Sequence, residues 1–429
     1  MPTVAVLTVF VMLTVLARPL TVAAQPAAQP AREFTLAALV AAADERNPAI
    51  AAARQAVQAA EAAVALARSG RGPTFTASGS VGTAGGGTST TTPSFSSGVS
   101  ISSSYVLYDS GQIQYAVRQA EANLKASRLS LEAVRQDVAQ TVALAYVSVL
   151  RAERAVRQRE QVVVQNRELL RLAEGQFRAG VVARADVVRA QAGLASAEGE
   201  LIAAQNVVAQ SKAALNQAIG ASPLAPIAVI APPPTPSVTI AATELANLVE
   251  QRPEIRRALA QIEAAEAAVL LAQAGGGLRV TLDGRATQSF NPNAQTTYSV
   301  SSGVSFPLSD AGRTQAAVAQ AAANLAAARA NIETTRLSAQ QQATSALLGI
   351  VSARARIESA RAQLAFAQES LRLAQGRYAA GAGPFLEVID AQTALVLAEV
   401  TLATAEYDEL AAAISLRYAL GRSVVDGAI

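Results

Sequence analysis

Three carboxylates are placed where they could interact with ions. Asp186, Glu387 and Asp390 each fall in the first turns of an expected helix. The positive end of the helix dipole stabilises a carboxylate there, and this explains any one of them without a binding role. The chain contains no cysteine and no histidine, so a Ser–His–Asp or Cys–His set cannot form, and thiol and imidazole ligands for zinc or copper are missing. We therefore predict no enzyme, no metal site and no cofactor.

The carboxylates belong to a segment that occurs twice. Residues 169–198, LLRLAEGQFRAGVVARADVVRAQAGLASAE, align with residues 370–399, SLRLAQGRYAAGAGPFLEVIDAQTALVLAE. Each copy contains a helical run, an aromatic residue, a lone glycine (Gly180 or Gly381) and a second helical run. Glycine readily adopts the left-handed conformation that ends a helix and reverses the chain. Each copy therefore predicts a helical hairpin with a short turn.

Four segments rich in serine and threonine alternate apolar and polar residues, which predicts strands. We expect these strands at residues 74–83, 94–106, 280–290 and 298–306, with polar tips at Gly85–Pro93 and Asn291–Gln295. Strands of about 9–11 residues with one apolar face match the wall of an outer-membrane barrel. A small soluble sheet covering a core is the alternative. Four strands cannot close a barrel, so closure requires several copies of the chain.

Two long runs without proline follow the strands. Gln112 to about Phe177 and Arg313 to about Tyr378 would each form roughly 100 Å of helix at 1.5 Å per residue. Asp109 or Asp310 precedes each run and can cap it. A helix of this length has no core of its own, so its apolar stripe must pack on other helices as a coiled coil. We expect return helices at about 183–219 and 384–420.

The order of these elements divides the chain into two repeats. Val4–Leu16 is apolar and is followed by the small residues Val22-Ala23-Ala24, which predicts a secretory signal peptide cut after Ala24. A transmembrane anchor is the alternative, because no Lys or Arg precedes the apolar run. The predicted organisation is a signal peptide (1–24), a flexible arm (25–33), a first repeat (34–220), a proline-rich linker (221–242), a second repeat (243–421) and a tail (422–429).

In this arrangement the chain resembles the TolC-type outer-membrane efflux proteins over nearly its whole mature length. The Asp-x-Gly corners at 109–111 and 310–312, the two glycine turns and Asp390-Ala391-Gln392 carry the resemblance together. It implies a mainly α fold with a small β part, in which long coiled-coil helical hairpins are internally duplicated and four transmembrane β-strands come from each chain. Three chains would build a twelve-stranded β-barrel on a twelve-helix α-barrel.

The resemblance also implies a task and partners. The task is that of the exit duct of a tripartite efflux or type I secretion system in the outer membrane of a Gram-negative-type cell. The helices would extend into the periplasm and gate the duct at their tips. The implied partners are two further copies of the chain in a homotrimer, a periplasmic adaptor (membrane fusion protein), an inner-membrane pump and outer-membrane lipid. No nucleic-acid partner is expected, and the net charge of only +3 agrees.

The implied pore and gate residues lie at the tips. Glu387 and Asp390 match positions that line the constricted end of the channel, where threefold symmetry would make rings of carboxylates that favour cations. Asp186 and Tyr378 match positions that make polar links between neighbouring tip helices in the closed state. An arginine serves there as a partner in the best-known family member.

In this chain Gly383 occupies the place of that arginine, and Arg184 is a candidate substitute. The adaptor is expected to dock on the two turns, which consist of Gly180, Val181, Val182, Gly381, Ala382 and Gly383. Tight-turn geometry alone also accounts for these residues.

A trimeric periplasmic scaffold or surface adhesin is the alternative function, with the strands as a head and the helices as a stalk. A stalk needs no duplicated return helices, so the duplication favours the duct. An adaptor protein is a weaker rival, because adaptors generally carry one hairpin flanked by β domains.

Overall fold

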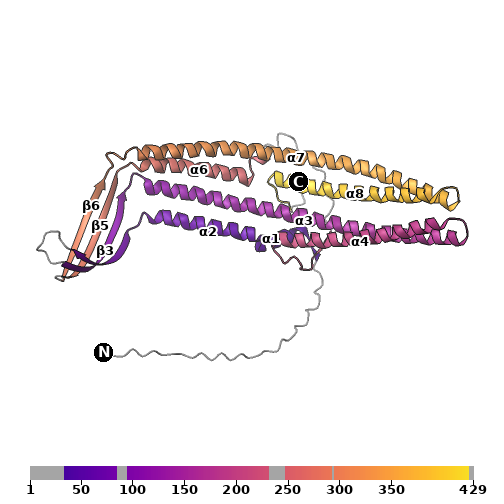
Figure 1. Cartoon of the computed structure of the whole chain (residues 1–429). Helices are drawn as coiled ribbons and strands as arrows, with labels where there is room; N and C mark the ends of the chain where they lie inside the picture. Colours follow the sequence, from indigo (N-terminus) through magenta and orange to yellow (C-terminus); the bar gives the residue numbers. More distant parts are fainter. Residues whose placement is uncertain (1–32, 85–93, 231–246, 292–293, 425–429) are drawn as a thin grey trace, which may run out of the picture.

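The computed structural model describes residues 33–84, 94–230, 247–291 and 294–424. An antiparallel sheet forms one end of an elongated molecule, and helices run from it to two hairpin tips at the other end (Figure 1). The expected signal peptide, the first loop tip Gly85–Pro93, and most of the arm, linker and tail lie outside the described residues. Their predicted boundaries stay predictions.

Six of the described helices form three pairs of equal length, with one member of each pair from each half of the chain, and α1 stands apart from these pairs. The long helices α3 and α7 have 67 residues each, the return helices α4 and α8 have 35 each, and α2 and α6 have 22 each. The fold is thus mainly helical, internally duplicated and accompanied by a small sheet. The helices are α1 (Leu36–Arg46), α2 (Pro48–Ser69), α3 (Gln112–Arg178), α4 (Arg184–Ala218), α6 (Pro253–Ala274), α7 (Arg313–Ala379) and α8 (Phe385–Ala419).

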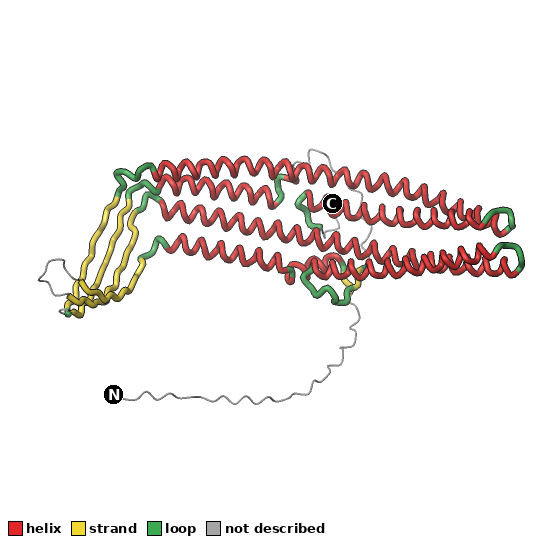
Figure 2. The backbone as a smooth tube through the Cα atoms, viewed as in Figure 1, coloured by secondary structure: helices red, strands yellow, loops and turns green. Residues whose placement is uncertain are grey.

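Each long helix has two shorter helices along it. Helices α2 and α4 follow one another beside α3, and α6 and α8 follow one another beside α7 (Figure 2). Many of the buried contact residues are alanines, such as Ala143 and Ala343 at 0% exposure, which lets helix backbones approach closely. No helix of the described chain combines the length and the apolar character needed to cross a membrane.

The sheet contains β2 (Thr74–Ala84), β3 (Ser94–Tyr108), β5 (Arg279–Asn291) and β6 (Gln295–Ser305), in the order β2-β3-β5-β6. All its pairings are antiparallel. The strands match the predicted ones, with ends shifted by at most three residues. A separate two-stranded parallel sheet pairs β1 (Glu33–Phe34) with β4 (Ala228–Val229) and ties the start of the first repeat to the linker that follows it.

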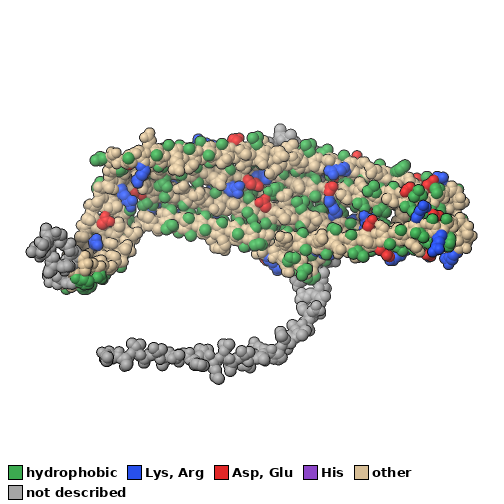
Figure 3. Space-filling model, viewed as in Figure 1, with side chains coloured by type: hydrophobic (Ala, Val, Ile, Leu, Met, Phe, Trp, Pro, Cys, Tyr) green, Lys and Arg blue, Asp and Glu red, His purple; other side chains and the backbone are tan. Residues whose placement is uncertain are grey.

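The register separates the sheet into an apolar and a polar face. Ala77 pairs with Ile101, Ile101 with Ala286, and Ala286 with Tyr298, so one line of apolar residues crosses all four strands. The apolar face is uncovered in the single chain, and Tyr298 and Val300 are 81% and 80% exposed. The part of the sheet turned to the viewer in Figure 3 is mostly uncharged, whereas the helices carry scattered groups of charged side chains.

The turns from strand to long helix are built alike in both repeats. The Asp109 carboxylate accepts hydrogen bonds from the backbone N–H groups of Gly111 (3.0 Å) and Ile113 (2.7 Å). Asp310 accepts the corresponding bonds from Gly312 (3.0 Å) and Thr314 (2.8 Å). These bonds satisfy backbone donors at the start of each helix. The predicted capping by both aspartates is therefore confirmed.

The end of α4 meets the break between α1 and α2. Asn47 accepts a hydrogen bond from the backbone N–H of Ala49 (2.8 Å) and donates one to the carbonyl of Ala218 (2.7 Å). Gly220 adopts φ +76°, and a Cβ built there would lie 2.6 Å from the Arg46 carbonyl oxygen. The equivalent Gly421, φ +66°, would place a Cβ 3.4 Å from the Arg252 side chain. Only glycine fits the first position without moving backbone.

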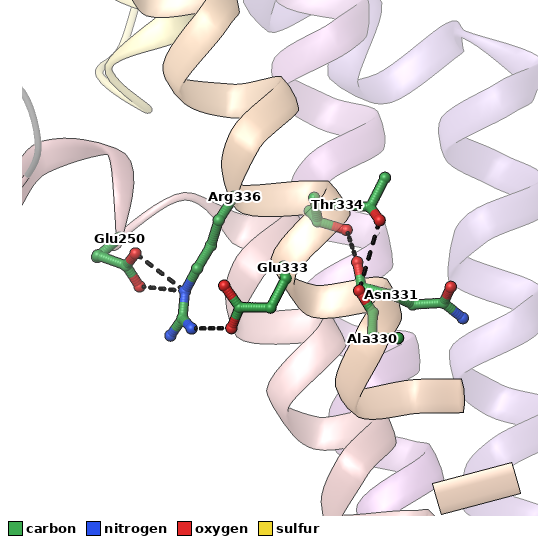
Figure 4. A network of polar contacts seen from close by, with 7 residues as sticks. Glu250, Ala330, Asn331, Glu333, Thr334 and Arg336 are labelled. Atoms are coloured by element: carbon green, nitrogen blue, oxygen red, sulfur yellow. Dashed lines mark hydrogen bonds and ion pairs between the residues drawn. The ribbon is translucent and has the colours of Figure 1, made fainter. Parts of the chain in front are cut away.

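The start of the second repeat is held on α7 by an arginine. Arg336 pairs with Glu250, just before α6, at 3.1 Å and with Glu333 on its own helix at 2.8 Å (Figure 4). Both carboxylates raise the pKa of Arg336, so the guanidinium stays charged. Nearby, Thr334 donates a hydrogen bond to the Ala330 carbonyl within α7.

The two helix-end glycines allow a matched test of the joint. Gly220→Ala and Gly421→Ala should each cost roughly 1–2 kcal/mol for a left-handed alanine. Gly220→Ala should cost about 1–3 kcal/mol more, because its methyl group meets backbone rather than a movable side chain. Thermal unfolding of the detergent-solubilised variants measures the difference. Equal midpoints for both variants would contradict the close contact at Gly220.

Candidate functional site at the helical tips

Both hairpin tips are formed by a turn that requires glycine. Gly180 adopts φ +75°, and the N–H of Val181 bonds to the carbonyl of Gln176 at 2.9 Å. Gly381 adopts φ +70°, and the N–H of Ala382 bonds to the carbonyl of Arg377 at 2.8 Å. This six-to-one bond beside a left-handed glycine is the Schellman ending of a helix. Nothing lies within 4 Å of a Cβ built at either glycine, so both turns face open space.

The two tips differ in how their aromatic residues are placed. In the α7–α8 tip, Tyr378 and Phe385 are buried, at 4% and 2% exposure, and their rings pack with centroids 5.3 Å apart. The residues at the same places in the α3–α4 tip are Phe177, which is 43% exposed, and Arg184, which is exposed. The second tip is therefore closed by an aromatic pair that the first tip lacks.

The buried cluster behind this pair joins the two hairpins. It contains Leu169 and Ala173 from α3, Ala190 from α4, Leu371 from α7 and Val388 from α8. Burial of side chains from all four helices fixes the relative position of the tips within one chain.

The Tyr378 hydroxyl is buried without a hydrogen-bond partner among the described residues. Burial, and then the negative charge of Asp186, raise the pKa of this phenol above its usual value. The group therefore remains neutral and able to donate a hydrogen bond at physiological pH. The structure thus brings Asp186 and Tyr378 into the same electrostatic neighbourhood without a direct bond between them.

The three tip carboxylates have different partners. Asp186 pairs with Arg189 one turn along α4 at 3.5 Å, and Glu387 pairs with Arg377 of α7 at 3.2 Å. Asp390 is exposed and forms no ion pair within the described chain. It is therefore the tip carboxylate whose charge is least compensated.

Arg377 occupies space that Gly383 leaves open. A Cβ built on Gly383 would lie 3.1 Å from the Arg377 Cβ and 3.4 Å from an oxygen of Glu387. Arg184, the candidate substitute for the missing arginine, is exposed and forms no ion pair with any described residue. Sequence reasoning missed Arg377 and Arg189. The three-residue spacing from Asp186 to Arg189 was a readable signal, whereas the Arg377–Glu387 pair depends on the folded turn.

A groove of about 960 Å³ runs between α3 and the α7–α8 hairpin behind the tips. Its walls include Leu172 and Gln176 from α3, Tyr378 from α7 and Val388 from α8. A side-chain oxygen of Gln176 is also buried without a partner in the described part of the chain. The groove lining mixes apolar residues with polar ones such as Glu168 and Gln375. Two of its lining residues, Gln176 and Tyr378, contain a buried polar atom without a partner in the described chain. No group of three or more potential metal ligands occurs within the described residues.

Known proteins share this sequence pattern and architecture. The sequence profile described as outer membrane efflux protein matches residues 39–221 and 245–422. The chain therefore belongs to the outer membrane efflux protein family, and the resemblance to TolC-type proteins is confirmed. This membership makes it an efflux channel protein of the outer membrane, with a helical extension. No curated protein sequence matches the chain significantly.

Solved structures share the fold across almost the whole chain. CusC matches with a TM-score of 0.81 and 24% identity over 90% of this chain and 92% of its own. VceC from Vibrio cholerae matches with a TM-score of 0.78 and 21% identity over 91% of this chain and 96% of its own. MtrE from Neisseria gonorrhoeae, in its open state, matches with a TM-score of 0.76 and 23% identity over 92% of this chain and 91% of its own.

The aromatic pair predicts unequal tips. Phe385→Ala should destabilise the α7–α8 tip by roughly 3 kcal/mol, because it empties a buried aromatic site. The matched variant Phe177→Ala should change stability by about 0.5 kcal/mol or less, because that ring is largely exposed. Hydrogen–deuterium exchange of peptides covering residues 370–395 and 170–195 measures both effects. Equal protection loss in the two variants would show that the tips are equivalent.

Proposed function

We propose that three copies of this chain form the exit duct of a tripartite efflux or type I secretion system. The supporting observation is a four-stranded sheet with an uncovered apolar face and two open edges, joined to helices of roughly 100 Å. In the described chain β2 and β6 each pair with only one neighbour. Pairing β6 of one copy with β2 of the next would satisfy both edges and close a twelve-stranded barrel.

The dimensions of the sheet support a lipid-facing wall. Its strands of 11 to 15 residues are long enough, at about 3.3 Å per residue, to cross a tilted barrel wall about 25 Å tall. The apolar face would contact outer-membrane lipid, and the polar face would line the duct. The helices of three copies would continue that duct as a cylinder into the periplasm.

The tips are the proposed gate. With threefold symmetry, Asp390 would form a ring of uncompensated carboxylates, and Glu387 a ring neutralised in part by Arg377. Tyr378, Asp186 and Arg184 are the polar groups we assign to contacts between neighbouring chains. The Tyr378 hydroxyl is neutral but buried in the single chain, so it would donate to a neighbouring chain only after the tip rearranges. Separation of these contacts would open the tip.

The two turns are the proposed docking points for a periplasmic adaptor that links the duct to an inner-membrane pump. Residues 180–182 and 381–383 are mostly exposed, and their glycines face open space. The groove behind the α7–α8 tip offers apolar walls on which an adaptor helix could lie.

Conductance separates the duct from a scaffold. Purified protein in a planar bilayer should form stable conducting units, and native mass spectrometry should show a trimer. A trimer that never conducts would support the scaffold or adhesin instead, and a stable monomer would exclude both.

Charge at the tip predicts the effect of single substitutions on ion selectivity. Asp390→Asn should shift the reversal potential in a KCl gradient toward chloride, because it removes an unpaired carboxylate. Glu387→Gln should shift it less, because Arg377 already compensates Glu387. Arg377→Gln should shift it toward potassium, and the double variant with alanine at 387 and 390 should lose most cation preference. Unchanged reversal potentials in all four would remove these residues from the pore wall.

A further inference from the structure

The two strand hairpins contain very few charges. Residues 74–108 and 279–306 include only three charged side chains, Arg279, Asp283 and Arg285. All three lie on β5. The rest of the polar face consists almost entirely of serine and threonine hydroxyls.

The register places these charges on the polar face. Arg285 pairs in register with Ser102 of β3 and Ser299 of β6. Asp283 pairs with Ser104 and Ser301, which lie on that face too. Because side chains two residues apart share a face, Arg279 joins them. The residues of β5 directly next to these three, such as Ala286, lie on the apolar face.

Arg285 forms a hydrogen bond but no ion pair within the described part of the chain. Its guanidinium extends toward β3 and lies 3.4 Å from the Ser100 hydroxyl, which itself lies 2.9 Å from the Ser78 hydroxyl. No ion pair joins Arg285 to a carboxylate of the described chain. Asp283 instead accepts a hydrogen bond from the Thr281 hydroxyl at 2.9 Å.

Arg279 occupies a different level of the sheet. It is the first residue of β5, next to the turn from the helices, whereas Arg285 lies at mid-strand, about 20 Å further along at 3.3 Å per residue. Asp283 lies between the two arginines on the same strand, roughly 7 Å from Arg285 and roughly 13 Å from Arg279 at about 3.3 Å per residue. It therefore offsets part of the Arg285 charge, and the three side chains together leave one net positive charge per chain on the polar face.

We propose that Arg285 determines the ion selectivity of the membrane-embedded section of the duct and makes this section favour anionic solutes. The proposal rests on the trimeric duct described above. In a closed barrel the apolar face must meet lipid, so three Arg285 side chains would project into the lumen at one level. A ring of fixed positive charge raises the local concentration of anions and repels cations. The two ends of the duct would then carry opposite charge, with Asp390 at the tips and Arg285 in the membrane.

The absence of cysteine from the whole chain allows a direct test. Arg285→Cys in the bilayer assay should shift the permeability ratio toward potassium. Modification with a positively charged methanethiosulfonate reagent should shift it back toward chloride, and a negatively charged reagent should shift it further toward potassium. Arg285→Lys should leave the ratio close to that of the unchanged chain, because it keeps the charge.

Two matched positions make the outcome specific. Ala286→Cys, one residue along on the apolar face, should give no change in ratio with either charged reagent. Asp283→Asn should shift the ratio toward chloride, opposite to Arg285→Cys. A conducting channel whose permeability ratio stays constant after every substitution and thiol modification at position 285 would overturn this inference and leave the proposed duct intact. A trimer that does not conduct would overturn the duct and the inference together.

Discussion

The long helices α3 and α7 are not stable without packing partners along their length, and the rest of the structure depends on supplying these partners. A helix of 67 residues has no interior, so its stability must come from neighbours along its length. The chain supplies those neighbours as pairs of shorter helices whose combined length follows each rod. Alanine at many contact positions keeps the backbones close. Where two short helices meet, the space is so limited that Gly220 contacts the backbone at Arg46, and Asn47 bonds across the junction.

The sheet differs from the helices because most of its apolar surface remains exposed in a single chain. The hydroxyl-bearing face and the apolar face are separated by register alone, and a slip of one residue would exchange them. The corners at Asp109 and Asp310 hold the connection from strand to helix, because each carboxylate accepts two hydrogen bonds from backbone N–H groups at the start of the helix. The Ser110 hydroxyl also donates to the Leu278 carbonyl and so connects the corner of one hairpin to the start of the other.

Much of this fold could be predicted from the sequence, because its signals are local. Period-two alternation located four strands, and Gly180 and Gly381 located the ends of the long helices within two residues. The site was harder to predict. Asp186, Glu387 and Asp390 all lie in the first turns of helices, and this local pattern does not predict their ion pairs. The pairs differ because Arg377 reaches Glu387 only after the α7–α8 turn has formed. Burial of Tyr378 and exposure of Phe177 follow from packing between hairpins, which no local pattern encodes.

The contrast between the two tips shows how far duplicated segments can diverge without losing a shared backbone. The return helices keep identical lengths of 35 residues, while Phe385 in one tip and Arg184 in the other make the two tips chemically different. One tip is closed by the buried Tyr378–Phe385 pair, and the other presents Phe177 and Arg184 to the surroundings. The two copies of the duplicated segment therefore share a backbone but are not interchangeable in the side chains that they expose.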